Sequence, residues 1–254
     1  VTIQATTGTL DGQSPSFSPG VDDSTIANTV INTALNAGTN VVIDTGNTGT
    51  QAGDINVNAA ITKSAGGNAS LTLNAANNIN LNADITSSVG ALDVFFVPDF
   101  DNSGAGTAVL ATSTVSLNGG VLNIAGTASK AGGVTTLNSD AILNNLIWTG
   151  ATITGSGTTT VNGTLTVNGV GVLSGHRLTL NGASTLNGIS QLRVDSGSLL
   201  TNNGAIDLAG DALIIQFTGT GSTITNNGSI TKTAGTGSSL IGATTMDGSG
   251  TLSV

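Results

Sequence analysis

The chain reads GDINVNAAIT at 53–62 and NNINLNADIT at 77–86, and these two stretches decide the fold. In both, apolar residues alternate with polar ones, which is typical of a half-buried β-strand. Identical residues recur in the same places 24 positions apart, and TNNGAI (201–206) and TNNGSI (225–230) repeat that offset far down the chain. A fixed period of this size is typical of a solenoid.

The spacing inside one period predicts how each coil is built. Ile55, Leu71 and Ile79 lie at separations of 16 and 8 residues, which suits a coil with three sides. We therefore predict an all-β fold, a right-handed parallel β-helix with coils of about 24 residues. A β-sandwich or barrel fits less well, because antiparallel hairpins do not demand one fixed register.

In such a coil Ile55 stacks on Ile79 inside, and the alternating asparagines point outward or lie at corners: Asn56, Asn58, Asn80 and Asn82. Two physical reasons for asparagine are open. Corner asparagines tolerate left-handed backbone angles, and stacked asparagine amides can bond to one another between coils.

The composition of the chain is consistent with a fold in which equivalent residues of successive coils stack on one another. Charged residues make up 7% of the chain and aromatic residues 2%, and all fourteen acids are Asp. Like charges stacked in register would repel, so neutral Asn, Thr and Ser fill the outward positions. Disorder is disfavoured, because the mean hydropathy is +0.26 and the apolar residues recur regularly.

Charge and residue counts exclude several classes of protein. With a net charge of −9 and five basic residues, the chain offers no basic patch for nucleic acid or an anionic membrane surface. Cysteine is absent, and no apolar run is long enough for membrane insertion. No signal peptide is recognisable. The start at Val1 and the strand pattern at 250–254 lead us to expect a piece of a longer protein.

One segment departs from the strand pattern. The stretch DDSTIANTVINTALNAG (22–38) offers Asp and Ser as N-caps and Gly38 at the C-terminal cap position. We predict a short helix at 24–37 that covers an end or a side of the solenoid. The predicted organisation is 1–126 as β-helix repeats with this helix, and 127–254 as further repeats continuous with the first part.

Four phrases in the first half carry a family resemblance: TALNAGTNVVIDTG (33–46), GDINVNAAITKSAGGNASLTLNAANNINLNADI (53–85), DFDNSGAGTAVL (99–110) and VSLNGGVLNIAG (115–126). Over roughly 24–126 the chain resembles the filamentous haemagglutinin-type exoproteins of bacteria, adhesins exported by two-partner secretion. The resemblance implies a right-handed β-helical shaft, a secreted or cell-surface location and adhesion, and it supplies no catalytic residues. That family's NPNG secretion motif is absent, so the chain would be a shaft segment.

We therefore expect a non-catalytic segment of a secreted bacterial surface adhesin that forms a stiff shaft for attachment. Its partner would be a host or environmental surface receptor or glycan, with homotypic end-to-end association as a further possibility. We assign no catalytic, cofactor-binding or metal-binding residues. The alternatives are a polysaccharide-acting β-helix lyase or hydrolase, and a subunit of a self-assembling extracellular filament.

Two clusters could still carry chemistry. DFDNSG places Asp99, Asp101 and Ser103 at positions 1, 3 and 5 of a calcium loop, but Leu110 occupies the position of the essential acid, so a polar turn is the alternative.

The second cluster is His176, Arg177, Arg193 and Asp195. In a pectin-acting enzyme an Arg could neutralise a sugar carboxylate and an Asp could act as base, which predicts one groove lined from adjacent coils. The alternative is a solvated face with weak ion pairing. Thr-rich strands at 158–160 and 164–166 could also form a flat array, although the pattern lapses in other coils.

Overall fold

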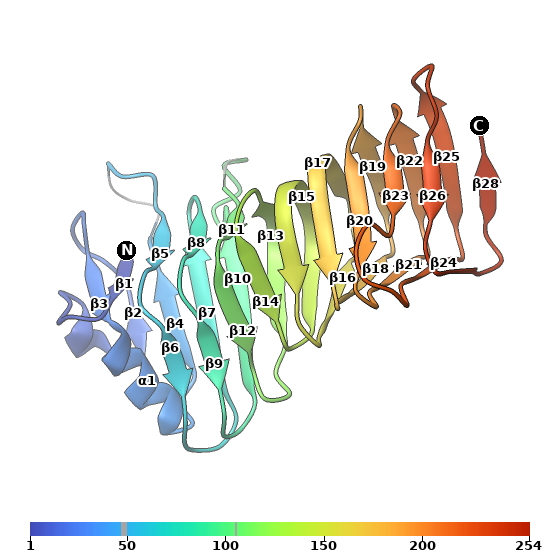
Figure 1. Ribbon diagram of the computed structural model, residues 1–254. Helices are drawn as coiled ribbons and strands as arrows, with labels where there is room; N and C mark the ends of the chain where they lie inside the picture. Colours follow the sequence, from blue (N-terminus) through green and yellow to red (C-terminus); the bar gives the residue numbers. More distant parts are fainter. Residues whose placement is uncertain (47–49, 105) are drawn as a thin grey trace. The chain divides into compact units, whose positions relative to one another are not determined.

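The computed structural model describes residues 1–46, 50–104 and 106–254. The chain is an all-β parallel solenoid of about 11 turns, with coils of about 22 residues and, in the described residues, a single helix. Figure 1 shows strands of successive coils side by side along each unit. Each strand pairs in parallel with its equivalent one coil away, as Ile55–Val57 does with Ile79–Leu81. The predicted fold class is confirmed.

The chain forms two compact units, Val1–Ala128 and Ser129–Val254. Unit 1 contains α1 (Asn28–Asn36), the 3-10 turn η1 (Asp11–Gln13) and the strands β1 (Thr2–Gln4), β2 (Ser16–Phe17), β3 (Thr25–Ala27), β4 (Val41–Asp44), β5 (Ile55–Val57), β6 (Ile61–Lys63), β7 (Ala69–Ala75), β8 (Ile79–Leu81), β9 (Ile85–Ser87), β10 (Leu92–Pro98), β11 (Ala108–Leu110) and β12 (Ser113–Ser116). Strand β13 (Leu122–Lys130) contains the boundary.

Unit 2 holds the remaining strands: β14 (Val134–Leu137), β15 (Ala141–Thr154), β16 (Thr158–Val161), β17 (Leu165–Ser174), β18 (Arg177–Leu180), β19 (Ala183–Asn187), β20 (Gln191–Asp195), β21 (Leu199–Asn202), β22 (Ala205–Ala209), β23 (Leu213–Ile215), β24 (Thr223–Asn226), β25 (Ser229–Ala234), β26 (Leu240–Gly242), β27 (Thr245–Asp247) and β28 (Thr251–Ser253).

The core is a stack of aliphatic rungs. Ile55 lies beside Ile79 and both are fully buried, whereas Asn58 and Asn82 at the ends of these strands are exposed. Alternate residues of a strand point to opposite faces, so each coil contributes one apolar layer. Trp148 also lies inside, where its indole N–H donates to the Ala151 carbonyl at 3.2 Å.

Coil length varies more than the two quoted repeats predict. Ile55 pairs with Ile79 after 24 residues, but Val41 pairs with Leu71 after 30 and Ala141 with Thr159 after only 18. The strands keep their register because loops between them absorb the extra residues, and long surface loops cost little stability.

The structure decides why asparagine recurs. Asn80 Nδ2 donates to Asn56 Oδ1 at 2.8 Å, and Asn82 Nδ2 donates to Asn58 Oδ1 at 2.9 Å. None of these four residues has a positive φ. Bonding between stacked amides is therefore confirmed, and the left-handed explanation is wrong for these positions.

Many Asp and Asn side chains also replace missing backbone pairs at corners. Their Oδ1 atoms accept backbone N–H groups of the next coil: Asp54 from Asn78, Asn68 from Ala91, Asp84 from Thr114, Asp93 from Val121, and Asp140 from Thr158. A short side chain suits this role, because each side-chain oxygen stands in for a backbone carbonyl.

The predicted helix exists, but its start is displaced. Residues 25–27 form β3, which pairs with β1, so α1 begins at Asn28 and ends at Asn36 instead of spanning 24–37. Its N-cap is Ala27, without a side-chain bond. Gly38 confirms the predicted C-terminal cap: it has a φ of 75°, and its N–H donates to Leu35 while that of Thr39 donates to Ala34.

α1 lies along the edge of β6 (Figure 1). Three asparagines four residues apart bond to the backbone there: Asn28 Nδ2 donates to the Ala60 carbonyl, Asn32 Oδ1 accepts from Thr62 N–H, and Asn36 Oδ1 accepts from Ser64 and Ala65 N–H. These side chains take the place of a neighbouring strand, and covering an edge in this way prevents pairing with other chains.

Candidate functional site

The proposed catalytic cluster is not assembled. His176 is fully buried; its Nε2 lies 2.9 Å from Thr159 Oγ1 and its Nδ1 lies 3.0 Å from the Gly155 carbonyl oxygen. Burial lowers the pKa of the imidazole, which opposes its becoming charged. His176 is therefore a bonded core residue.

The other three members lie on two different strands, since Arg193 and Asp195 share β20 and Arg177 is on β18. Arg177 is exposed on β18, where it pairs with Thr158 and Leu199, whereas Arg193 is on β20, a strand of a different column. Arg193 Nε donates to Gln191 Oε1 at 2.9 Å, and its guanidinium lies 4.1 Å from the centroid of the Phe217 ring.

Asp195 has a structural contact network of its own. It is 3% exposed, and its carboxylate accepts from Phe217 N–H at 2.6 Å, Thr218 N–H at 3.0 Å and Thr218 Oγ1 at 3.0 Å. It therefore fixes the loop of the next coil. The four residues are therefore not gathered on one face, because His176 is buried and Arg177 lies in a different column from Arg193 and Asp195.

The calcium-loop candidate closes on itself. Asp99 has a φ of 56°, and its Oδ1 accepts from Ser103 Oγ at 2.9 Å and from Gly104 N–H at 3.0 Å. Asp101 Oδ1 accepts from Ser103 N–H at 3.3 Å, and Leu110 is buried in β11. These bonds are those of a polar turn. Among residues 1–46, 50–104 and 106–254, no three His, Cys, Asp or Glu side chains are placed to hold a metal ion.

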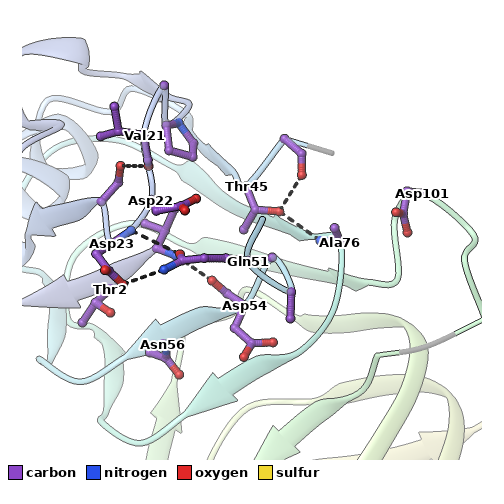
Figure 2. Close-up of a pocket in the computed structure, with 17 residues that line it drawn as sticks. Thr2, Val21, Asp22, Asp23, Thr45, Gln51, Asp54, Asn56, Ala76 and Asp101 are labelled. Atoms are coloured by element: carbon purple, nitrogen blue, oxygen red, sulfur yellow. Dashed lines mark hydrogen bonds between the residues drawn. The ribbon is translucent and has the colours of Figure 1, made fainter. Parts of the chain in front are cut away.

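Unit 1 carries a polar hollow of about 430 Å³ that is lined mainly by residues 19–24, 45–46 and 51–54. Figure 2 shows Asp22, Asp23, Gln51 and Asp54 around it. The acids are already held: Thr50 Oγ1 donates to Asp22, and Gln51 Nε2 donates to Asp23, each at 2.7 Å.

Asp54 belongs to the same hollow and is also engaged. Its Oδ1 accepts from Asn77 Nδ2 at 2.8 Å and from Asn78 N–H at 2.9 Å. These bonds join the coil of β5 to the coil of β8. The carboxylates of the hollow therefore fasten loops together, and no His, Lys or Arg side chain lies among the described residues that line it.

A different surface feature emerges only in three dimensions. The motif T-x-N-G occurs six times, at 160–163, 166–169, 179–182, 185–188, 201–204 and 225–228. The copies at 166–169 and 185–188 lie on β17 and β19, whereas the other four lie on β16, β18, β21 and β24, which are consecutive neighbours. We call the eight outward residues the Thr/Asn array: Thr160, Thr179, Thr201 and Thr225 in one column, and Asn162, Asn181, Asn203 and Asn227 in the next.

Hydrogen bonds connect the asparagines of the array in one direction. Asn181 donates to Asn162 at 2.9 Å, Asn203 to Asn181 at 2.9 Å, and Asn227 to Asn203 at 3.0 Å, each from Nδ2 to Oδ1. All four amides are exposed, and the threonine hydroxyls are half-buried. The bonds hold the amide groups in one common orientation.

Glycine occupies the last position of the motif in the array for a steric reason. A Cβ on Gly182 would lie 1.9 Å from the Gly163 carbonyl oxygen, and one on Gly228 would lie 1.8 Å from that of Gly204. Neither residue has a positive φ, so the requirement is close approach of backbones and not a left-handed conformation. The tight corner brings the asparagines of adjacent coils within bonding distance.

The sequence alone did not predict this array, although TNNG recurs at 201–204 and 225–228. The four copies in the array start 19, 22 and 24 residues apart, so no fixed period connects them. A search for T-x-N-G at variable spacing finds all four, but it also finds the copies on β17 and β19, and only the strand pairing separates the two groups. The threonine pattern predicted from 158–160 and 164–166 continues through four coils in the column of Thr160, and the column is bounded by Ile142 on one side and Asp247 on the other.

No family model, curated protein or solved structure matches this chain. Across the described part of the chain, the structure has no helix with the length and apolar character that crossing a membrane requires. What the chain does must therefore be inferred from its own surfaces.

Proposed function

We propose that this chain is a non-catalytic segment of a secreted bacterial surface adhesin, a β-helical shaft of the two-partner secretion type. The observation that carries the proposal is the in-register stack, in which neutral amides and hydroxyls cover an aliphatic core. Such a fold extends by adding coils and needs no chemistry at its surface. The resemblance over 24–126 agrees with this function, because its phrases correspond to strands and corners of unit 1.

Two observations weigh against the alternatives. The enzymatic alternative needs Arg177, Arg193 and Asp195 in one groove, but Arg177 lies in a different column from β20, which carries the other two. The carboxylate of Asp195 is also engaged in hydrogen bonds to the next coil. The filament alternative needs two open ends for head-to-tail stacking. At the first coil, α1 and the segment before β2 already bond to the outer edges of β6 and β3.

The proposal is tested by measuring whether this segment is exposed on the cell surface and whether it contributes to attachment. Antibodies raised against the 254-residue chain should label intact cells that produce the full gene product. Cells in which this segment is deleted should attach less to the surfaces that the unmodified cells colonise. Labelling that appears only after the cells are permeabilised would overturn the proposal.

The enzymatic alternative has its own assay. The purified chain is incubated with polygalacturonate, and unsaturated or reducing sugars are measured over time. We expect no product. Product formation that is lost in Arg193→Ala would favour the enzyme and contradict the non-catalytic function.

A further inference from the structure

We propose that the Thr/Asn array of unit 2 is a docking surface for an extended, uncharged polysaccharide. This inference rests on the proposed adhesive function and adds a ligand class and a surface to it. The array consists of four consecutive rungs from β16, β18, β21 and β24. No described element covers it, since its four asparagines are exposed.

The array has unused hydrogen-bonding groups that point to solvent. In the middle rungs each amide gives one N–H and one oxygen lone pair to the ladder, which leaves one N–H and one lone pair. The neighbouring hydroxyls of Thr179 and Thr201 have no partner within the described residues. Each rung therefore offers donors and acceptors together, which is what a sugar hydroxyl requires.

The spacing of these groups fits a regular polymer. Adjacent parallel strands lie about 4.8 Å apart, so four rungs span about 14 Å. One sugar residue of an extended β-linked polysaccharide has a comparable length. Successive sugars of a chain running across the strands could each face one rung, and the same bonds could repeat along the polymer.

Two further properties favour this ligand over others. The eight residues of the array carry no charge, and the chain as a whole has a net charge of −9, so an anionic polymer would be repelled. A peptide would need pockets for its side chains, whereas the array presents short side chains of only two kinds. The amide ladder also fixes the side chains before binding, which reduces the entropy lost on association.

The experiment measures retention of the whole 254-residue chain on insoluble cellulose and chitin. Amylose tests the need for an extended chain, and alginate tests the need for neutrality. We expect retention on cellulose or chitin, competition by their soluble oligosaccharides, and little retention on amylose or alginate. Equal retention on all four materials would overturn the proposal, as would no retention on cellulose and chitin.

Two double variants test the residues. Asn181→Leu with Asn203→Leu removes the central amides at similar size, and Thr179→Val with Thr201→Val removes only hydroxyls. Each should weaken binding at least about fivefold, because two hydrogen-bonding groups are lost. The matched control is Asn82→Leu, which breaks the exposed Asn58–Asn82 pair of unit 1 and should bind like the unmodified chain.

Thermal unfolding shows whether each variant folds. If the leucine variant does not fold, the threonine variant alone tests whether the array binds the polysaccharide. Unchanged binding in a folded variant would refute a role for the array. Failure here is distinguishable from failure of the adhesive function: surface labelling and reduced attachment of deletion cells would still hold if only the polysaccharide assay were negative.

Discussion

The first coil of unit 1 and the last coil of unit 2 differ in how the outer edges of their strands are bonded. In the first coil, Asn32 and Asn36 of α1 bond the edge of β6, and Asp11 Oδ1 accepts the Ala27 N–H of β3 at 2.7 Å. In the last coil, β26, β27 and β28 pair on one side only within the described residues.

The consequence is visible in equivalent inward residues. Ile230 is 1% exposed, but Leu252, which pairs with it in the last coil, is 61% exposed. Ile224 is fully buried, and its counterpart Met246 is 43% exposed. In a solenoid an inward-facing apolar residue is buried only if a further coil covers it. Its burial therefore depends on the adjacent coil as well as on the alternation within its own strand.

The largest expected effect tests this comparison directly. Ile230→Ala should lower the free energy of unfolding by about 3 kcal/mol, because it leaves a cavity in a covered layer. Leu252→Ala should cost less than about 1 kcal/mol, because little burial is lost. Urea unfolding followed by far-ultraviolet circular dichroism measures both. Equal costs would mean that the last coil is covered in solution.

The second prediction concerns a coil between the first and the last, where acidification should lower stability through the buried side chain of His176. The pKa of His176 is lowered, so the unfolded chain binds a proton below pH about 6.5 while the folded chain resists it. Stability should therefore fall on acidification, by at most about 1.4 kcal/mol per pH unit.

Thermal unfolding at pH 7 and pH 5 measures this loss. His176→Gln keeps a polar side chain that does not titrate, so its stability should change less across the same interval. An equal change in both proteins would assign the pH dependence to other groups.

The smallest effect concerns the contact between α1 and the backbone that follows β6. Asn36→Ala should lower stability by about 1 kcal/mol, because two backbone N–H groups lose their acceptor but remain open to water. Hydrogen exchange should show faster exchange at Ser64 and Ala65. Thr29→Ala, also exposed on α1, is the control and should leave these amides protected. Unchanged exchange in Asn36→Ala would mean that α1 does not protect this edge.

The success and the failures of prediction have particular causes. The stacking of Ile55 on Ile79 is predicted correctly, because one 24-residue repeat separates the two residues. Arg177 and Arg193 are close in sequence, but one whole coil would place a residue in the column of Arg177, as it does Leu199, and Arg193 comes earlier, so it falls in a different column. The Thr/Asn array is not predicted from the sequence, because coils of unequal length place its stacked residues at unequal spacings along the chain.

The sequence alone determined that strands stack in parallel, that aliphatic residues face inward and that asparagines recur at equivalent corners, because these follow from local alternation and from the repeat. Only the tertiary structure decided the order of the first coils, where β1 lies between β3 and β5 although β3 follows it in the chain. It also decided which strand edge α1 covers and which polar side chains meet. Those features depend on contacts between residues far apart in sequence, and local patterns do not encode loop paths.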